Sequence, residues 1–133
     1  MSYLTNKSDI NRAAADLLQA NYFYPSVVHC SYYSCIQLMK HIFLFTLNKS
    51  EADLEHEGKI MAAGSHEVLI NNITLLLKTN NKDWKTFNTN IIQLKRLRVT
   101  ADYQDAEIDS KKGNDSISLS DVVLKLLKSN VKI

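Results

Sequence analysis

The chain of 133 residues contains only three glycines and one proline. These two residue types mark most tight turns, so their scarcity argues against a strand-rich fold and favours helices. A length of 133 residues supplies one hydrophobic core but not two. The sequence therefore predicts a single all-α domain over residues 1–133.

Excess charge and cysteine are also scarce. The 16 basic and 14 acidic residues leave a formal net charge of +2, too small by itself to indicate nucleic acid or an acidic membrane. Cys30 and Cys35 form no C-x-x-C pair, and two thiols in a short chain indicate a reducing cytoplasm. We expect both thiols to be buried structural residues.

No uninterrupted apolar run is long enough to cross a membrane. The longest apolar segment, residues 22–47, is broken by His29, Gln37, Lys40 and His41, and polar or charged groups at such depths are costly in lipid. The polar start MSYLTNKSDINR lacks the apolar core of a signal peptide. We therefore expect a cytoplasmic protein without membrane association.

Apolar residues at helical spacing predict five helices, arranged as an up-down antiparallel bundle of four to five helices. The helices are expected to begin near Ser8 or Asp9, Pro25, Ser65, Asp83 and Ser118. In the first helix, the stripe expected to face the core consists of Ile10, Ala14, Leu17 and Leu18.

Two polar segments are expected to connect these helices. Residues 48–64 predict a loop or a loosely helical excursion, and residues 109–115 (DSKKGND) predict a second loop. Ser118, with Asp121 three residues on, resembles a capping box with Asp in place of Glu, which marks the start of the last helix.

Familiar catalytic motifs are missing. No two of the four histidines have zinc-ligand spacing, and the sequence has no H-E-x-x-H motif, Gly-rich phosphate loop or G-x-S-x-G elbow. The four are His29, His41, His56 and His66. We expect neither a metal site nor a cofactor.

The apolar stripe of the fourth helix leads to a charged residue. The stripe consists of Trp84, Phe87, Ile91 and Leu94. The next position on the same face is Arg98, with Asp102 one turn later. One interpretation is an Arg98–Asp102 ion pair within the helix, worth ~0.3–0.5 kcal/mol. The other is a partly buried arginine that binds phosphate with its planar fork of donors, with Lys95 and Arg96 adding positive potential.

Three short motifs occur in a distinctive order. They are the paired tyrosines Tyr32-Tyr33, the segment SHEV at 65–68, and R-x-x-A-D-Y at 98–103. In this order the chain resembles the HEPN family of small helical proteins associated with nucleic acids and nucleotides, over residues 8–127. One branch of that family has an R-x-x-A-D-Y ending in place of R-x(4–6)-H.

The resemblance implies a helical bundle that forms a homodimer and brings two R-x(4–6)-H motifs into one cleft. Active HEPN members are metal-independent ribonucleases, often toxins of toxin–antitoxin or other defence systems, and many are neutralised by a small nucleotidyltransferase. Their arginine stabilises charge on the scissile phosphate, and their histidine helps to move a proton from the ribose 2′-hydroxyl. RNA or a nucleotide is the implied ligand, and a nucleotidyltransferase is an implied partner.

The chain departs from the family pattern where the histidine should lie. Counted from Arg98, that histidine falls at positions 103–105, which hold Tyr, Gln and Asp. A tyrosine with a pKa near ~10 is a poor general base at neutral pH. His66 either supplies an imidazole from the third helix or lies on the surface where that helix begins. The candidate catalytic residues are Arg98, Tyr103 and His66, and the candidate ligand-binding residues are Arg98, Asp102, Tyr33 and Lys95.

Three functions remain open on the sequence alone. The first is an HEPN-like module that binds RNA or a nucleotide. The second is a ribonuclease toxin that uses Arg98 with His66 or Tyr103. The third is a non-enzymatic helical interaction domain that partners a nucleotidyltransferase or another protein. One of Tyr32 and Tyr33 is expected to fill the core, while the other reaches the groove with its hydroxyl.

Overall fold

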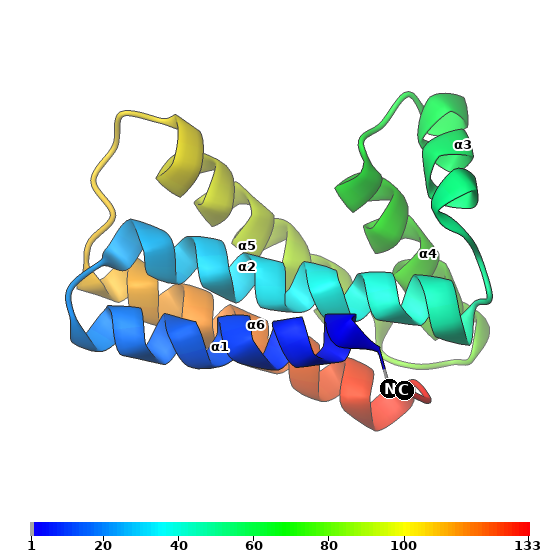
Figure 1. Ribbon diagram of the computed structural model, residues 1–133, viewed down its shortest axis with the longest axis horizontal. Coiled ribbons are helices and arrows are strands. Elements are labelled where there is room, and N and C mark those ends of the chain that lie inside the picture. The colour runs from blue at the N-terminus through cyan, green and yellow to red at the C-terminus, as the bar shows by residue number, and fades with distance from the viewer. Residues whose placement is uncertain (1) are drawn as a thin grey trace.

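The computed structural model describes residues 2–133 and shows six α-helices, one π-helical turn and no strand in that range (Figure 1). The elements are α1 (Tyr3–Ala20), α2 (Tyr24–His41), η1 (Ile42–Thr46), α3 (Glu51–Met61), α4 (Ser65–Thr79), α5 (Trp84–Tyr103) and α6 (Ser110–Asn130). The predicted all-α bundle is confirmed, with six α-helices in place of the expected five.

The sixth helix, α3, lies inside the segment 48–64 that was expected to be a loop or a loosely helical excursion. Ser50 forms a capping box with Asp53, in which the backbone N–H of Asp53 donates to Ser50 Oγ at 3.1 Å. In return, the backbone N–H of Ser50 donates to Asp53 Oδ2 at 2.8 Å. The local pattern S-x-x-D thus starts a regular helix in a polar segment.

The same pattern at Ser118 and Asp121 has no such role, because both residues lie inside α6. This helix is capped earlier, where Asp109 accepts a hydrogen bond from the backbone N–H of Lys112 at 2.9 Å. The predicted loop at 109–115 is therefore wrong, and so is the predicted helix start at Ser118. A cap inside a continuous polar stretch is hard to place, because several Ser and Asp residues offer the same chemistry.

Helix α1 is also placed differently from the prediction. It begins at Tyr3, and Ser8 does not cap it but donates its hydroxyl to the carbonyl of Ser34 on α2 at 2.6 Å. Ile10 and Leu17 were expected in the core, yet they are 58% and 67% exposed. The buried residues of α1 are the small Ser8 and Ala15, beside the partly buried Leu4 and Leu18.

The other helix boundaries agree better with the sequence. Pro25 lies in the first turn of α2, and the expected cap Asp83 accepts a hydrogen bond from the backbone N–H of Thr86 at 3.1 Å. The apolar stretch after Tyr24 is α-helical only to His41 and then continues as the π-helical turn η1. Cys35 is buried as expected, whereas Cys30 is only partly buried, and both thiols are free.

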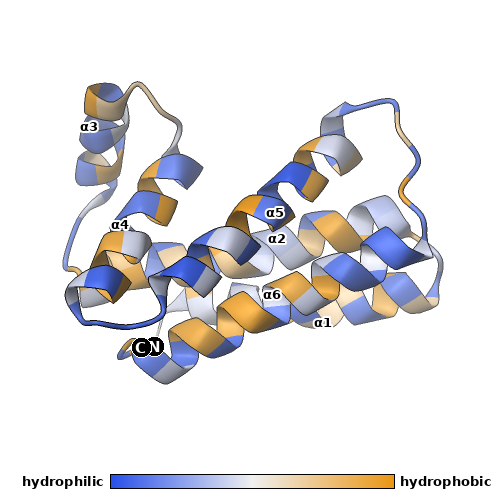
Figure 2. Ribbon diagram, turned by 180° about the vertical axis from the view of Figure 1, so that it is seen from behind, coloured by the Kyte–Doolittle hydropathy of each residue, from blue (hydrophilic) through white to orange (hydrophobic). Residues whose placement is uncertain are grey.

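The hydrophobic core is formed mainly by α2, α4, α5 and α6, and none of its described members comes from α1. Its largest fully buried side chains are Tyr32, Phe43 and Phe87. Hydrophobic and hydrophilic segments alternate along α5 and α6 (Figure 2), as expected of helices with one buried face. The site described below is built on the α2–α5 part of this core.

No single helix within residues 2–133 has both the length and the apolar composition needed to cross a membrane. Helices α3 and α4 meet those criteria only when taken together, and they are bent by 96° relative to one another.

Substitutions at two helical isoleucines, one buried and one exposed, test which residues form the hydrophobic core. Ile91 on α5 is 0% exposed, and Ile60 on α3 is 71% exposed. We expect Ile91→Ala to lower the free energy of unfolding by about 2–5 kcal/mol, because it leaves a cavity. Ile60→Ala should change it by less than about 0.5 kcal/mol. Urea denaturation measures both values, and equal effects would contradict the described core.

Candidate functional site around Arg98

The buried face of α5 has a positively charged member. Its buried residues are Phe87, Ile91, Leu94 and Arg98. The predicted stripe is thus confirmed, with Trp84 partly buried at its start. Arg98 is only 8% exposed although it lies close to the end of the helix. Guanidinium groups are rarely so buried unless they are paired. The groups around Arg98 therefore determine its role.

Three tyrosine rings surround the guanidinium of Arg98. Its Cζ atom lies 5.0 Å from the ring centroid of Tyr32, 5.9 Å from that of Tyr33 and 5.4 Å from that of Tyr103. The first two rings come from α2, and the third closes the last turn of α5. Both members of the Tyr32-Tyr33 pair therefore contact the arginine, although Tyr32 is fully buried and Tyr33 only partly. These are distances at which a cation is attracted to the face of an aromatic ring.

Few of the N–H groups of the Arg98 guanidinium have a hydrogen-bond partner. Nη1 of Arg98 donates to the hydroxyl of Tyr103 at 3.3 Å. Nε is buried and has no hydrogen-bond partner among the described residues. Nη1 lies 3.8 Å from Oδ2 of Asp102, which is an ion-pair contact but too long for a hydrogen bond. The predicted Arg98–Asp102 pair exists, but it does not satisfy the arginine.

Asp102 is bound instead to a histidine that the sequence analysis did not assign to this site. Oδ2 of Asp102 lies 2.9 Å from Nδ1 of His29 on α2. The imidazole of His29 also lies beside the ring of Tyr33, with centroids 4.6 Å apart. Position 29 is one helical turn before position 33, and that spacing was the only sequence signal for its place here.

His66 at the start of α4 reaches the same cluster, so it is not an isolated surface residue. Its Nδ1 lies 3.0 Å from the hydroxyl of Tyr32. Burial raises the pKa of Tyr32 well above its ordinary value, so the hydroxyl keeps its proton. Burial, followed by the positive charges of Arg98 and Lys95, lowers the pKa of His66. A neutral imidazole can then either accept a hydrogen bond from the Tyr32 hydroxyl at Nδ1 or donate one to the Tyr32 oxygen from Nδ1–H.

The structure brings most of the predicted site residues together and places one at the rim. Tyr33, His66, Asp102 and Tyr103 all lie around Arg98. Lys95 lies one turn earlier on α5, where Nζ donates to Oε1 of Glu67 on α4 at 3.1 Å. Lys95 therefore contributes positive potential from the edge of the cluster.

Two hollows in the described surface lie away from this cluster. One, of about 790 Å³, lies between α3 and the start of α4, and its lining includes Leu54 and Lys59. Another, of about 510 Å³, lies between α5 and α6 beside Arg96 and Leu119. Within residues 2–133, no group of three or more His, Cys, Asp or Glu side chains is arranged to hold a metal ion. The chemistry around Arg98 is thus that of a buried cation among aromatic rings.

The electrostatics of this cluster predict the titration of His66. Its folded-state pKa is lowered, so the unfolded chain, with a histidine pKa of ~6.5, binds the proton more readily. The stability that His66 contributes is therefore complete above that value and decreases as the pH falls through the folded pKa. We expect NMR titration to give a midpoint below ~6.5, and Arg98→Gln to raise it. Arg96→Gln, the same change at an exposed neighbour, should leave it in place, and an ordinary midpoint in the wild type would contradict this environment.

No protein-family model, no curated protein and no solved structure matches this chain. The functional conclusion therefore depends on the residues themselves.

Proposed function

We propose that the protein is an HEPN-like module that binds RNA or a nucleotide, with Arg98 holding a phosphate group. The observation that supports this most is a buried guanidinium whose Nε has no partner and whose nearest carboxylate lies 3.8 Å away. A buried charge without full compensation is costly, so a site of this kind favours an anion that completes it. Phosphate fits best, because its oxygens accept two parallel N–H donors from an arginine.

The neighbouring side chains have distinct roles in this proposal. Tyr32 and Tyr33 hold the guanidinium by its face, so that Nε and one terminal nitrogen can donate to phosphate oxygens. Tyr103, which is 74% exposed, accepts the hydrogen bond of Nη1 when no ligand is present and moves aside when one binds. The exposed ring of Tyr103 and the partly buried ring of Tyr33 provide surfaces on which a base can stack.

Binding can be tested with a short fluorescent single-stranded RNA and with a nucleoside triphosphate. Loss of a charged hydrogen-bonding group costs roughly 1.5–3 kcal/mol, so we expect Arg98→Ala to weaken binding by about 10-fold to 100-fold. Arg98→Lys should restore only part of it, because lysine lacks the planar fork. Fluorescence anisotropy and calorimetry measure these affinities.

The matched control is Arg96→Ala, which removes the same charge from an exposed position on the same helix. Tyr103→Phe keeps the exposed ring but removes the hydroxyl that competes for Nη1, so it should bind phosphate as tightly as the wild type or more tightly. If Arg98→Ala folds, as judged by circular dichroism, and still binds RNA normally, the proposal is wrong. In that case a weakened complex with a nucleotidyltransferase would favour the alternative, a non-enzymatic interaction domain.

Ribonuclease activity is a second candidate function, favoured by the position of His66. When Nδ1–H of a neutral His66 donates to the Tyr32 oxygen, Nε2 is unprotonated and can act as a general base near a phosphate on Arg98. Arg98 would stabilise the charge that develops on the phosphate, while His66 accepts the proton of the 2′-hydroxyl. Tyr103 suits this role less well, because its hydroxyl oxygen already accepts the hydrogen bond of Arg98 Nη1.

We expect wild-type protein to cleave RNA in the presence of EDTA, and His66→Gln to reduce the rate by about 10²–10⁴-fold without changing RNA affinity. Gel analysis of a labelled RNA measures cleavage, and His56→Gln, on α3, serves as the matched control. If no variant or condition gives cleavage, the enzymatic function is excluded and the binding function stands. The prediction that a homodimer places two Arg98 side chains in one cleft stays a prediction, and comparison of cleavage at several protein concentrations addresses it.

A further inference from the structure

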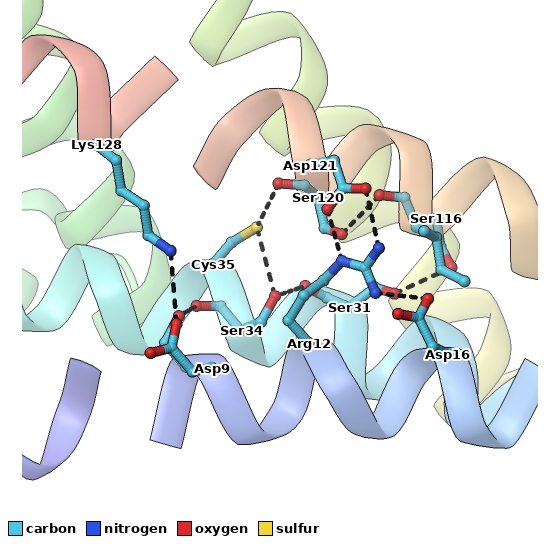
Figure 3. A network of polar contacts seen from close by, with 12 residues as sticks. Asp9, Arg12, Asp16, Ser31, Ser34, Cys35, Ser116, Ser120, Asp121 and Lys128 are labelled. Atoms are coloured by element: carbon cyan, nitrogen blue, oxygen red, sulfur yellow. Dashed lines mark hydrogen bonds and ion pairs between the residues drawn. The ribbon is translucent and has the colours of Figure 1, made fainter. Parts of the chain in front are cut away.

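Helix α1 is attached to the bundle through its polar and small residues. Ser8 and Asn11 donate to Ser34 and Gln37 of α2, at 2.6 and 2.8 Å. Figure 3 shows Arg12 of α1 facing Asp121 of α6. The arginine donates from Nε and Nη2 to the two carboxylate oxygens of Asp121, at 2.6 and 2.9 Å. The inner face of α1 therefore carries the hydrogen bonds and ion pairs that usually face water.

The outer face of α1 carries three of its large apolar side chains, whereas Leu4 and Leu18 are partly buried. Tyr3, Ile10 and Leu17 are 84%, 58% and 67% exposed and are spaced seven residues apart. Three residues after each of them lies a smaller residue that is also exposed, namely Asn6, Ala13 and Ala20. This is the 3-4 spacing of a two-helix interface, with large residues in one row and small residues in the next. An amphipathic helix with its apolar row facing solvent indicates association.

We propose that a second copy of this chain covers the outer face of α1, with the two α1 helices antiparallel about a two-fold axis. The row is complementary to itself in that direction. If the axis passes between Ile10 and Ala13, Ile10 packs on the partner's Ala13. Tyr3 then packs on the partner's Ala20, and Leu17 on the partner's Asn6. Every layer combines a large residue with a small or short one, as knobs-into-holes packing requires.

The charges beside the row are compatible with this pairing. Asp9 and Asp16 lie along one edge, where antiparallel copies approach each other. Each is already paired within its own protomer, Asp16 with Arg12 at 2.8 Å and Asp9 with Lys128 at 3.5 Å. Because both carboxylates are paired with basic side chains of the same protomer, repulsion between the two acidic edges is limited.

The small area of the outer face of α1 limits the affinity expected for the dimer. An 18-residue helix is ~27 Å long, and one such face buries less than the ~800 Å² per partner of a standard interface. We expect a dimer that dissociates on the order of micromolar concentration. Because α2 lies between α1 and α5 (Figure 1), this interface is on a different face from Arg98 and does not depend on the proposed function.

Sedimentation equilibrium over a range of protein concentrations tests the proposal. The wild type should show association that depends on concentration, and Ile10→Glu with Leu17→Glu should lose the association through α1, which leaves at most the separate dimer predicted around Arg98. The matched control replaces Ile60 and Leu75, which are 71% and 63% exposed on α3 and α4, by Glu and should dimerise like the wild type. All four positions are exposed, so the fold should survive, and circular dichroism checks it. A wild type that stays monomeric at millimolar concentration, or an α1 variant that associates as tightly as the wild type, would overturn the proposal.

Cross-linking tests the antiparallel direction. In a Cys30→Ser background, a short bismaleimide is applied to Ala13→Cys or Ala20→Cys, and Cys35 is buried and protected. In the antiparallel pair, the two copies of position 13 lie ~4.5 Å apart along the axis and those of position 20 lie ~25 Å apart. We expect only Ala13→Cys to cross-link. Cross-linking of both variants would indicate a parallel pair, and cross-linking of neither would exclude this interface.

Discussion

The guanidinium of Arg98 lies within the core on tyrosine rings rather than against a carboxylate. Each such cation–π contact contributes ~0.5–2 kcal/mol, whereas removal of a charge from water costs several kcal/mol even after relaxation. The rings therefore position the arginine without fully compensating its charge, and Asp102 lies 3.8 Å from Nη1. A buried cation whose charge is only partly compensated is a group that a bound anion would stabilise.

Of the three neighbouring groups Arg98, Tyr32 and His66, only Arg98 is charged near neutral pH. Burial raises the pKa of Tyr32 and lowers that of His66, so both stay neutral near pH 7. Asp102, which could have neutralised the arginine, is oriented toward His29 at 2.9 Å. One physical cause, burial on the α2–α5 surface, thus gives a charged donor next to a neutral acceptor. That combination suits phosphate binding, and also proton transfer from a ribose hydroxyl.

Helix α2 separates two surfaces with opposite chemistry. On one side, α5 and the start of α4 bring polar and aromatic groups to Arg98. On the other, α1 is held by the Arg12–Asp121 fork and by serine contacts (Figure 3), and it presents its apolar row to the outside. The exposed Ile10 and Leu17 follow from this arrangement, because the small inner residues allow α1 to lie close to α2.

The sequence by itself determined the helical class, the cap at Asp83 and the buried stripe that includes Arg98. Each of these depends on residues within a few turns of one helix, where spacing alone decides which side chains share a face. It did not determine the orientation of α1, whose apolar pattern pointed to the wrong face, or the partners of Asp102 and His66. Tertiary structure decided those, because His29 lies 73 positions from Asp102 and Tyr32 lies 34 from His66. Contacts between distant segments depend on how whole helices pack, and helical periodicity carries no information about that packing.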